Sequence, residues 1–309
     1  MITFGPVQSR RLGKSLGINN VPPPKTCSYS CIYCQVGLTR HMTTRRREMY
    51  PPETILEETG KRLRLLDRAD YPDYLTFVAD GEPTLDKRLG ESIRLLKGFE
   101  IPVAVITNGT LLGDPEVAEA LSEADWVSLK ADTADNETWK KINRPCKTLE
   151  LEDMHASYKR FAEMFEGILV TETMLVSGVN DATDTIKETA DFISTLDPLV
   201  SYISVPVRPP AVQSAVMPER SDIESARDIF LKVLPNVVLL DKFEGAETGY
   251  TGDAVQDITA MCAVHPMRED TMARLLGKDN AGEDTVDRLL REGKIKKTCY
   301  RSHTFYLKK

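Results

Sequence analysis

Short apolar runs alternate with amphipathic segments over most of the chain, from about residue 16 to residue 240. Most of the runs are continuous stretches of apolar residues, as in parallel strands that are covered on both faces. Parallel strands need crossover connections, and the intervening amphipathic segments supply them as helices. The expected strands are Leu16–Ile18, Tyr74–Ala79, Val103–Thr107, Trp126–Lys130, Ile168–Val176, Tyr202–Val205 and a last run, Val237–Leu240.

The expected helices between these strands are Pro52–Leu66, Leu85–Leu96, Pro115–Leu121, Leu151–Phe165, Asp184–Leu196 and Asp222–Leu234. Strands and helices together make six βα units, which is fewer than a closed eight-stranded barrel requires. We therefore expect the α/β class, with a curved and partly open (βα)6 barrel over residues 1–241.

The remainder of the chain is expected to form a small second domain. Residues 242–253 hold three glycines without apolar periodicity, which is typical of a linker. Beyond them, residues 254–309 contain three short helical patterns, Ala254–Cys262, Arg268–Leu276 and Glu283–Arg291, and then a hairpin pattern. Three helices and a hairpin predict a winged-helix-like domain, in which His265 and His303 are expected to be turn and wing residues.

Composition and charge exclude several classes of protein. Hydrophobic residues make up 41% and charged residues 28%, as in ordinary globular domains. No apolar run approaches the roughly 18 residues that a membrane span needs, so we expect no membrane partner and a cytoplasmic location. Residues 254–309 carry 11 Lys and Arg against 8 Asp and Glu, or +3, whereas the rest carries 29 against 39, or −10.

Three cysteines, Cys27, Cys31 and Cys34, follow the first expected strand with the spacing C-x3-C-x2-C. Three thiolates can hold a [4Fe–4S] cluster and leave one iron open to another ligand. A structural zinc site needs a fourth ligand, and the nearest candidate, His41, lies outside the usual spacing. Cys146, Cys262 and Cys299 are scattered singly, and we expect them to be ordinary thiols.

Ligands of βα sheets bind beyond the carboxyl ends of the strands, so the residues that follow each strand are candidates for a site. These positions hold small and polar residues, namely Asp80-Gly81-Glu82-Pro83, Asn108-Gly109, Lys130, Asp132, Ser177–Asn180 and Arg208. Asp80 and Glu82 could act as an acid–base pair, but residues two apart on an extended loop point in opposite directions.

The cysteine motif, with Tyr33 directly before the last cysteine, resembles the cluster motif of the radical S-adenosylmethionine (SAM) superfamily. The stretch Gly-Pro-Val-x-Ser-Arg-Arg-Leu-Gly, followed by Pro-Pro-Lys-Thr-Cys, resembles the branch that contains the wyosine-forming tRNA enzymes. Those enzymes hold an extra cluster on cysteines upstream of the main motif, whereas the first 26 residues here contain none.

The resemblance implies that Cys27, Cys31 and Cys34 hold a [4Fe–4S] cluster and that Tyr33 packs near the adenine of SAM. Gly81, Glu82 and Pro83 match the superfamily's Gly-Gly-Glu-type loop, with Asp80 in place of the first glycine. The remaining candidates for contact with SAM are Asn108, Lys130, Asp132 and Arg208. For Lys130 and Asp132 a mutual salt bridge is an equal alternative, Arg208 could serve the substrate instead, and Met174 is expected in the core.

The basic segment from Arg40 to Arg47 could line a path to an anionic substrate, or it could form a charged edge hairpin. Arg10 and Arg11 could neutralise an anion near the cluster or lie at the surface.

The expected function is reductive cleavage of SAM to a 5′-deoxyadenosyl radical, with an external electron donor of the flavodoxin or ferredoxin type. The sequence does not identify the substrate, which could be RNA or a peptide reached through the C-terminal domain, or a small molecule. The alternative is a non-catalytic iron–sulfur electron carrier or sensor.

Overall fold

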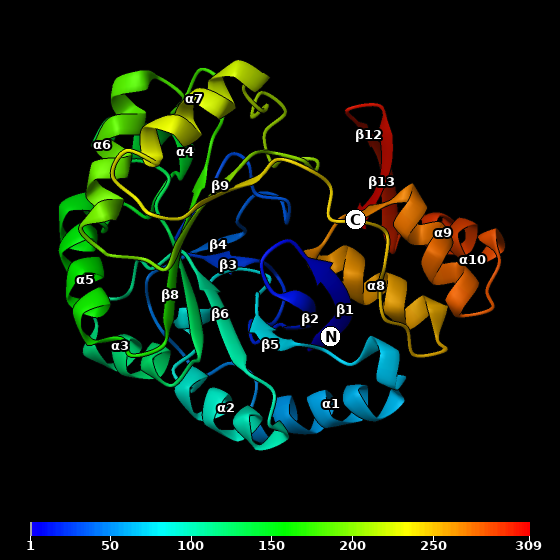
Figure 1. Ribbon diagram of the computed structural model, residues 1–309. Helices are drawn as coiled ribbons and strands as arrows, with labels where there is room; N and C mark the ends of the chain where they lie inside the picture. The colour runs from blue at the N-terminus through cyan, green and yellow to red at the C-terminus, as the bar shows by residue number, and fades with distance from the viewer. Residues whose placement is uncertain (1) are drawn as a thin grey trace.

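The computed structural model describes residues 2–309 and contains one curled eight-stranded sheet (Figure 1). Seven of its strands are parallel, and β1 (Thr3–Ser9) pairs antiparallel with β2 at one edge. The parallel strands follow in the order β2 (Gly13–Ile18), β5 (Tyr74–Phe77), β6 (Val103–Thr107), β7 (Trp126–Lys130), β8 (Ile168–Met174), β9 (Val200–Ser204) and β10 (Val237–Leu240). The partial (βα)6 barrel expected from the sequence is confirmed.

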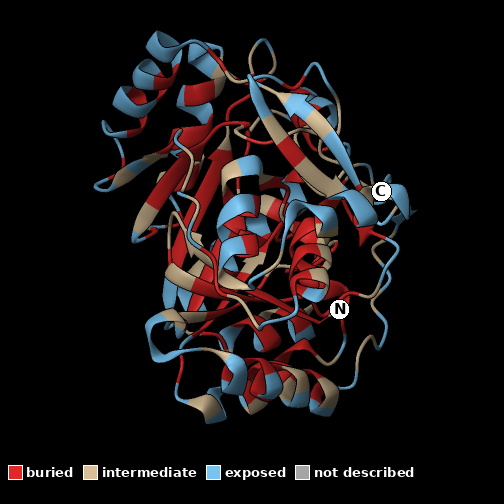
Figure 2. Ribbon diagram, turned by 90° about the vertical axis from the view of Figure 1, so that its right-hand side faces the viewer, coloured by how far each residue is buried: buried red, intermediate tan, exposed pale blue. Residues whose placement is uncertain are grey.

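The helices lie outside the curled sheet and cover its convex face (Figure 1). They are α1 (Pro52–Leu65), α2 (Leu89–Leu96), α3 (Pro115–Ser122), α5 (Leu151–Met164), α6 (Thr183–Ser194) and α7 (Arg220–Phe230). Strand residues such as Leu75, Val105 and Val127 are fully buried, so the strands are the buried core of the molecule (Figure 2). Coverage by helices on one face and by lumen side chains on the other explains why the strands are continuous apolar runs.

Several helices and strands begin or end at other residues than the sequence analysis expected. The helix expected from Leu85 begins only at Leu89, after a 3₁₀ turn, η2 (Pro83–Leu85). The Asp86 carboxylate accepts a hydrogen bond from the Arg88 backbone N–H, which holds a turn there instead of a helix. The helix expected over Asp222–Leu234 ends at Phe230, and the strand expected to reach Ala79 ends at Phe77.

The sequence analysis missed several short elements, of which β1 and α4 are the longest. β1 contains Gly5 and Pro6, which weaken a strand pattern, and its pairing with β2 shifts register between Phe4 and Val7. α4 (Asn136–Ile142) is short and polar. Asp135 caps its N-terminus, because the Asp135 side chain accepts a hydrogen bond from the Thr138 N–H. Neither element changes the barrel, but β1 forms its edge.

The C-terminal segment holds three helices and a small sheet, close to the expected bounds. These are α8 (Ala254–Val264), α9 (Glu269–Lys278), α10 (Glu283–Arg291) and the strands β11 (Met267–Arg268), β12 (Ile295–Tyr300) and β13 (His303–Lys308). α8 packs on β1 through Phe4, Ala260 and Val264. The guanidinium of Arg62 on α1 pairs with Asp257 on α8, and both side chains are buried.

Residues 254–309 therefore contact the barrel through a buried ion pair and an apolar cluster. The division at residues 242–253 and the winged-helix-like character of this segment stay predictions. Among residues 2–309, no helix has the length and apolarity that crossing a membrane would take.

Candidate active site

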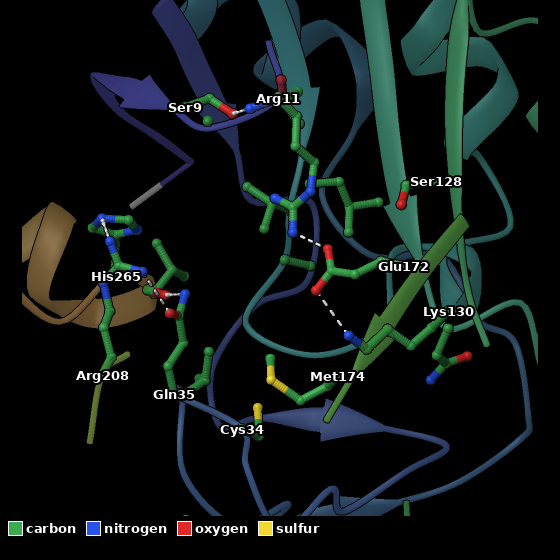
Figure 3. A pocket seen from close by; sticks show the side chains of 18 of the residues that line it. Ser9, Arg11, Cys34, Gln35, Ser128, Lys130, Glu172, Met174, Arg208 and His265 are labelled. Atoms are coloured by element: carbon green, nitrogen blue, oxygen red, sulfur yellow. Dashed lines mark hydrogen bonds and ion pairs between the residues drawn. The ribbon is translucent and has the colours of Figure 1, made fainter. Parts of the chain in front are cut away.

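A cavity of about 310 Å³ lies inside the curled sheet (Figure 3). Cys27, Cys31 and Cys34 line it, together with residues from the loops that follow β5 and β6. Arg11, from the turn between β1 and β2, and Glu172, from β8, line it as well. The volume falls within the range of small-molecule and cofactor sites. The cavity runs from the carboxyl ends of the strands, where the sequence analysis expected ligands to bind, into the lumen that the strands enclose.

The cysteine loop is tied to the barrel by backbone pairing. β3 (Thr26–Cys27) pairs in parallel with β4 (His41–Met42), so the alternative of an edge hairpin over residues 40–47 is wrong. The Cys34 N–H donates to the Cys31 carbonyl at 3.2 Å, and the Ile32 N–H donates to the Ile142 carbonyl at 2.9 Å. These bonds hold the loop in a compact turn that leaves Cys31 and Cys34 half-buried.

Burial controls the protonation of the thiols. Burial raises the pKa of Cys27 far above its ordinary value, and the nearby charges of Glu82 and Cys31 add to the effect. Burial, together with the charges of Cys34 and Asp132, raises the pKa of Cys31 to about 11. Because a metal-bound thiol is deprotonated, loading of a cluster would have to release protons from these groups.

Lys25 brings a positive charge to the cysteine loop. Its Nζ lies 3.0 Å from the Cys34 Sγ and 2.5 Å from the Gly37 carbonyl oxygen. Burial lowers the pKa of Lys25, but the charge of Cys34 and the hydrogen bond to it outweigh burial, and the net pKa is raised. An ammonium beside a thiolate favours the charged form of the sulfur.

The three cysteines suit an iron–sulfur cluster better than a single metal ion. No three His, Cys, Asp or Glu side chains of residues 2–309 converge on a position for one metal ion. A [4Fe–4S] cluster takes one thiolate on each of several irons, and thiolates are the ligands that such clusters use. Three cysteines on one compact loop, facing one cavity and carrying a nearby ammonium, fit that requirement.

The loop after β5 packs directly on the cysteine loop. Gly81 has a φ of +145° and forms a bridge with Thr26, and a Cβ at this position would overlap the Thr26 carbonyl. The Glu82 N–H donates to that same carbonyl at 3.1 Å. A glycine is therefore needed here for both the backbone conformation and the close approach.

The side chain of Glu82 is engaged by the protein. One carboxylate oxygen accepts from the Thr84 backbone N–H, the Thr84 hydroxyl and the Thr107 hydroxyl, and the other accepts from the Asn108 N–H at 2.8 Å. Asp80 instead faces Lys308, with Oδ2 at 3.8 Å from Nζ. Asp80 and Glu82 thus point in different directions, as expected, and do not form an acid–base pair.

Asn108 connects the end of β6 to the cysteine loop. Its Nδ2 donates to the Ser28 hydroxyl at 2.9 Å and lies 3.6 Å from the Cys27 Sγ. Its Oδ1 accepts from the N–H and hydroxyl of Thr110. Thus Gly81, Glu82 and Asn108, which sequence analysis singled out separately, form one connected layer beside Cys27.

Tyr33, Lys130 and Asp132 meet at the end of β7. The Tyr33 hydroxyl donates to the Asp132 carboxylate, which also accepts from Asn143 Nδ2 at 2.6 Å. Lys130 Nζ lies 3.5 Å from Asp132 Oδ1 and 5.0 Å from the centroid of the Tyr33 ring. The mutual salt bridge considered for Lys130 and Asp132 is present, and it also holds the aromatic residue of the cysteine motif.

Glu172, which the sequence analysis missed, lies at the centre of a second group in the lumen (Figure 3). Its carboxylate accepts from the Arg11 guanidinium, from Lys130 Nζ at 2.8 Å and from the Ser204 hydroxyl at 2.9 Å. The available signal was a carboxylate inside an otherwise uncharged strand, because a buried charge requires a partner. Met174, expected in the core, also lines the cavity.

Arg208, Glu244 and His265 form a third group. Arg208 pairs with Glu244, and its Nη2 donates to His265 Nε2 at 2.9 Å (Figure 3). Burial, followed by the charges of Arg208 and Arg10, holds the pKa of His265 well below 6.5, so its ring is neutral and accepts this bond. His265 lies in the bend directly after α8, as expected, and it also lines the cavity, which was not expected.

Fold and site together define the class: a barrel enzyme that builds its site at the carboxyl edge of a partial βα sheet. Residues 21–193 match the family described as the Radical SAM superfamily, which is more than half of the chain, and the chain belongs to that superfamily. It is 41% identical, over 309 residues, to the UPF0026 protein MJ1312 of Methanocaldococcus jannaschii. The match covers 99% of this chain and 96% of that protein.

Two solved structures show the same fold at low identity. One is TYW1 with a lysine-pyruvate adduct bound, with a TM-score of 0.56, 17% identity, and coverage of 72% of this chain and 76% of the other. The second is a radical SAM methyltransferase from Sphaerobacter thermophilus, with a TM-score of 0.56, 16% identity, and coverage of 74% and 66%. At these identities the two likenesses show the shared fold.

Superfamily membership makes the chain an enzyme of the radical SAM type, and it does not favour the alternative of a non-catalytic electron carrier or sensor. Members of this superfamily use a [4Fe–4S] cluster, SAM and an external electron donor.

Proposed function

We propose that this protein holds a [4Fe–4S] cluster on Cys27, Cys31 and Cys34, and cleaves SAM reductively to abstract hydrogen from a substrate in the lumen. The observation that carries the proposal is that the three thiols line one cavity together with Gly81 and Glu82 of the loop after β5. Nothing in an electron carrier requires that second loop at the cluster. When bound, the cluster supplies the electron that breaks SAM into methionine and the 5′-deoxyadenosyl radical.

The residues beside the cysteines have separate tasks in this proposal. In the Gly81–Pro83 loop, we expect the Gly81 carbonyl to accept from the ammonium group of SAM, since the Glu82 and Pro83 carbonyls already accept from the Leu85 and Asp86 N–H groups. The Glu82 carboxylate holds that loop on β6, since its oxygens are engaged by Thr84, Thr107 and Asn108. Asn108 holds the cysteine loop through Ser28, and its amide stays within reach of SAM.

The end of β7 provides the groups for the remainder of SAM. Tyr33 offers an aromatic face to the adenine, and its hydroxyl is fixed by Asp132. Lys130 is a candidate for the SAM carboxylate. Asp132, expected at the ribose, is instead fully buried and accepts from Tyr33, Asn143 and the Met174 N–H, so it holds Tyr33 and Lys130 in place. Burial lowers the pKa of Lys130 more than the charge of Asp132 raises it, so an additional carboxylate close by would stabilise its charged form. Arg208 is a second candidate for the carboxylate, or for the substrate.

The substrate class follows from the C-terminal segment. The β12–β13 hairpin contacts the barrel rim at two points: the Tyr300 hydroxyl donates to the Pro206 carbonyl at 2.9 Å, and Lys308 lies 3.8 Å from Asp80. Lys294, Lys296 and Lys297 on this hairpin and the turn before it are exposed. A basic surface next to the cavity suits an anionic macromolecule, so the substrate is RNA, as in tRNA modification, or an acidic peptide.

The electron reaches the cluster from an external one-electron donor of the flavodoxin or ferredoxin type. The experiment that tests the proposal measures SAM binding by equilibrium dialysis, using anaerobic, cluster-loaded protein. We expect saturable binding, and weaker binding in Glu82→Ala with unchanged iron content. Arg94→Gln, which changes an exposed residue, serves as control. Binding of SAM with equal affinity after loss of the cluster would contradict the proposal.

A further inference from the structure

The end of the cavity that lies away from the cysteines has a surplus of positive charge. Three cationic side chains line this part, Arg10, Arg11 and Arg208, whereas two carboxylates face them, Glu172 and Glu244. The difference, 3 − 2, is +1, and Lys130 does not enter it because Asp132 is its own partner. Buried charges without partners are unfavourable, so a surplus of this kind points to a missing anion rather than to a stabilising network.

Arg11 enters the lumen because its turn is fixed. The Ser9 hydroxyl oxygen accepts from the backbone N–H groups of Arg11 and Leu12, both at 3.2 Å, and closes the turn between β1 and β2. This turn precedes β2, whereas the cysteine loop follows it, so Arg11 approaches from the opposite edge of the sheet. Its side chain then crosses the lumen to Glu172 (Figure 3).

Neither Arg11 nor Arg208 uses all of its donors. The Nε atoms of both side chains are buried and have no hydrogen-bond partner within residues 2–309. The Arg208 side chain is only 6% exposed. A guanidinium presents its donors in a planar fork that matches the two oxygens of a carboxylate or phosphate, so an unused Nε is half of such a site.

The cations also act on one another. Burial lowers the pKa of Arg11 to about 9, and the charge of Arg10 contributes to this change. Burial lowers the pKa of Arg208 to about 9 as well, with contributions from Arg10, Arg11 and Arg268. The three arginines are therefore close enough for mutual repulsion, which a bound anion would relieve.

We propose that Arg11, with Arg10 and Arg208 nearby, binds an oxyanion group of the substrate, a carboxylate or a phosphate, inside the lumen. This inference rests on the proposed function, because the same cavity must hold SAM at its cysteine end. Glu172 is the internal competitor for the site, since it shares its carboxylate between Arg11 and Lys130. The substrate is thereby an acidic molecule whose anionic group is held on the side of the lumen opposite the cluster.

The experiment measures binding of inorganic phosphate by calorimetry to anaerobic, cluster-loaded protein saturated with SAM. Chloride keeps the ionic strength constant, so a general salt effect cancels. We expect saturable binding that weakens about tenfold or more in Arg11→Gln, because a charge-assisted hydrogen bond is lost. Glu172→Gln should bind phosphate more tightly than the wild type, since the competing carboxylate is gone.

A folding defect would weaken phosphate binding in both variants, whereas we expect weaker binding in Arg11→Gln and tighter binding in Glu172→Gln. Arg94→Gln is the matched control, and phosphate binding should be unchanged in it, because Arg94 is exposed and pairs with Glu123. Acetate in place of phosphate separates the two sources: tighter acetate binding assigns a carboxylate substrate, and tighter phosphate binding assigns a phosphorylated one.

Equal phosphate affinity in wild type, Arg11→Gln and Glu172→Gln would overturn the inference. Phosphate binding that disappears on saturation with SAM would also overturn it, since the arginines would then serve the SAM carboxylate, and the proposed function would stand. Failure of the cluster-loaded protein to bind SAM at all would instead contradict the proposed function, whatever phosphate does.

Discussion

The two ends of the cavity are built in different ways. The cysteine end comes largely from one continuous stretch, Lys25–Cys34, held by short backbone bonds. The arginine end is assembled from side chains that are far apart in the chain, namely Arg11, Glu172, Arg208, Glu244 and His265. It is completed only when α8 packs on β1 and brings His265 to Arg208.

This difference separates the cluster-binding part of the cavity, which proteins with different substrates can share, from the part that can recognise one particular substrate. A short loop with fixed spacing is enough to hold a cluster, so it can be the same in proteins with different substrates. A group that depends on several strands and on the C-terminal segment can vary without disturbing that loop. We infer that the cysteine end carries the reaction with SAM and that the arginine end selects the substrate.

Removal of the cysteines should have the largest effect and should be confined to one end. The wild-type protein, prepared without oxygen, should contain about four irons and a broad visible absorption that dithionite bleaches. Replacing Cys27, Cys31 and Cys34 together with alanine should abolish both properties, because no thiolate remains in the cavity. Iron analysis and absorption spectra measure the outcome.

Cys146 and Cys299 provide the control, since neither lines the cavity. The double variant Cys146→Ala with Cys299→Ala should keep its iron. If the control loses its iron and the triple variant keeps it, the cluster belongs to the other cysteines and the comparison of the two ends is wrong.

Gly81→Ala should have the next largest effect. A Cβ at this position overlaps the Thr26 carbonyl, so the loop must move away from the residue that precedes Cys27. We expect iron content to fall severalfold in reconstituted protein. Gly178 also has a positive φ, of +68°, but an added Cβ there meets no atom within 4 Å. The variant Gly178→Ala should therefore lose about 1 kcal/mol of stability and keep its iron. Equal iron loss in both variants would show that backbone strain alone is responsible.

Arg208→Gln, which breaks the buried pair with Glu244 at the arginine end, should lower the free energy of unfolding. The variant leaves the buried Glu244 with Arg10, at 3.9 Å, and His265 as neighbours. Losing one partner of a buried pair typically costs about 3 kcal/mol, whereas losing an exposed pair, as in Arg94→Gln, costs about 1 kcal/mol or less. Chemical denaturation of the metal-free proteins gives both values. Similar losses would mean that the arginine end is not a buried, coupled group.

The smallest effect is a pH dependence that His265 confers. Its pKa is lowered in the folded state, so below its ordinary value of 6.5 the unfolded chain binds a proton that the folded chain does not. Stability from this group is therefore present above pH 6.5 and is lost as the pH falls, by up to about 1.4 kcal/mol per pH unit. Between pH 7 and pH 5, wild type should lose more stability than His265→Gln. Parallel stability curves would contradict the neutral histidine beside Arg208, Arg10 and Glu244.

The barrel could be predicted from the sequence because its strands are buried on both faces. Continuous apolar runs and regularly placed helices specified six βα units and the final strand, Val237–Leu240, without any long-range information. β1 could not be predicted, because Gly5 and Pro6 obscure the strand pattern, and its existence depends on pairing with β2. The same holds for α4, a short polar helix with a single capping residue, Asp135.

Site residues could be predicted where a short stretch of sequence identifies them, and not where their role depends on partners far away in the chain. The spacing of the cysteines and the strand-end positions of Glu82, Asn108 and Lys130 led to residues that line one cavity. Glu172 and Glu244 were not found, because each is identified by its partners, and the partners are distant in the chain. His265 was assigned to a turn, because sequence alone does not show that α8 ends at the cavity.

Cleavage of SAM at the cysteine end of the cavity is measured as 5′-deoxyadenosine formed when anaerobic, reduced, cluster-loaded protein is incubated with SAM, with the triple cysteine-to-alanine variant as control. We expect 5′-deoxyadenosine from the wild-type protein, from Arg94→Gln and, at reduced level, from Glu82→Ala, and none from the triple variant. No 5′-deoxyadenosine from a reduced protein that contains its full complement of iron would contradict this expectation and would favour an electron carrier.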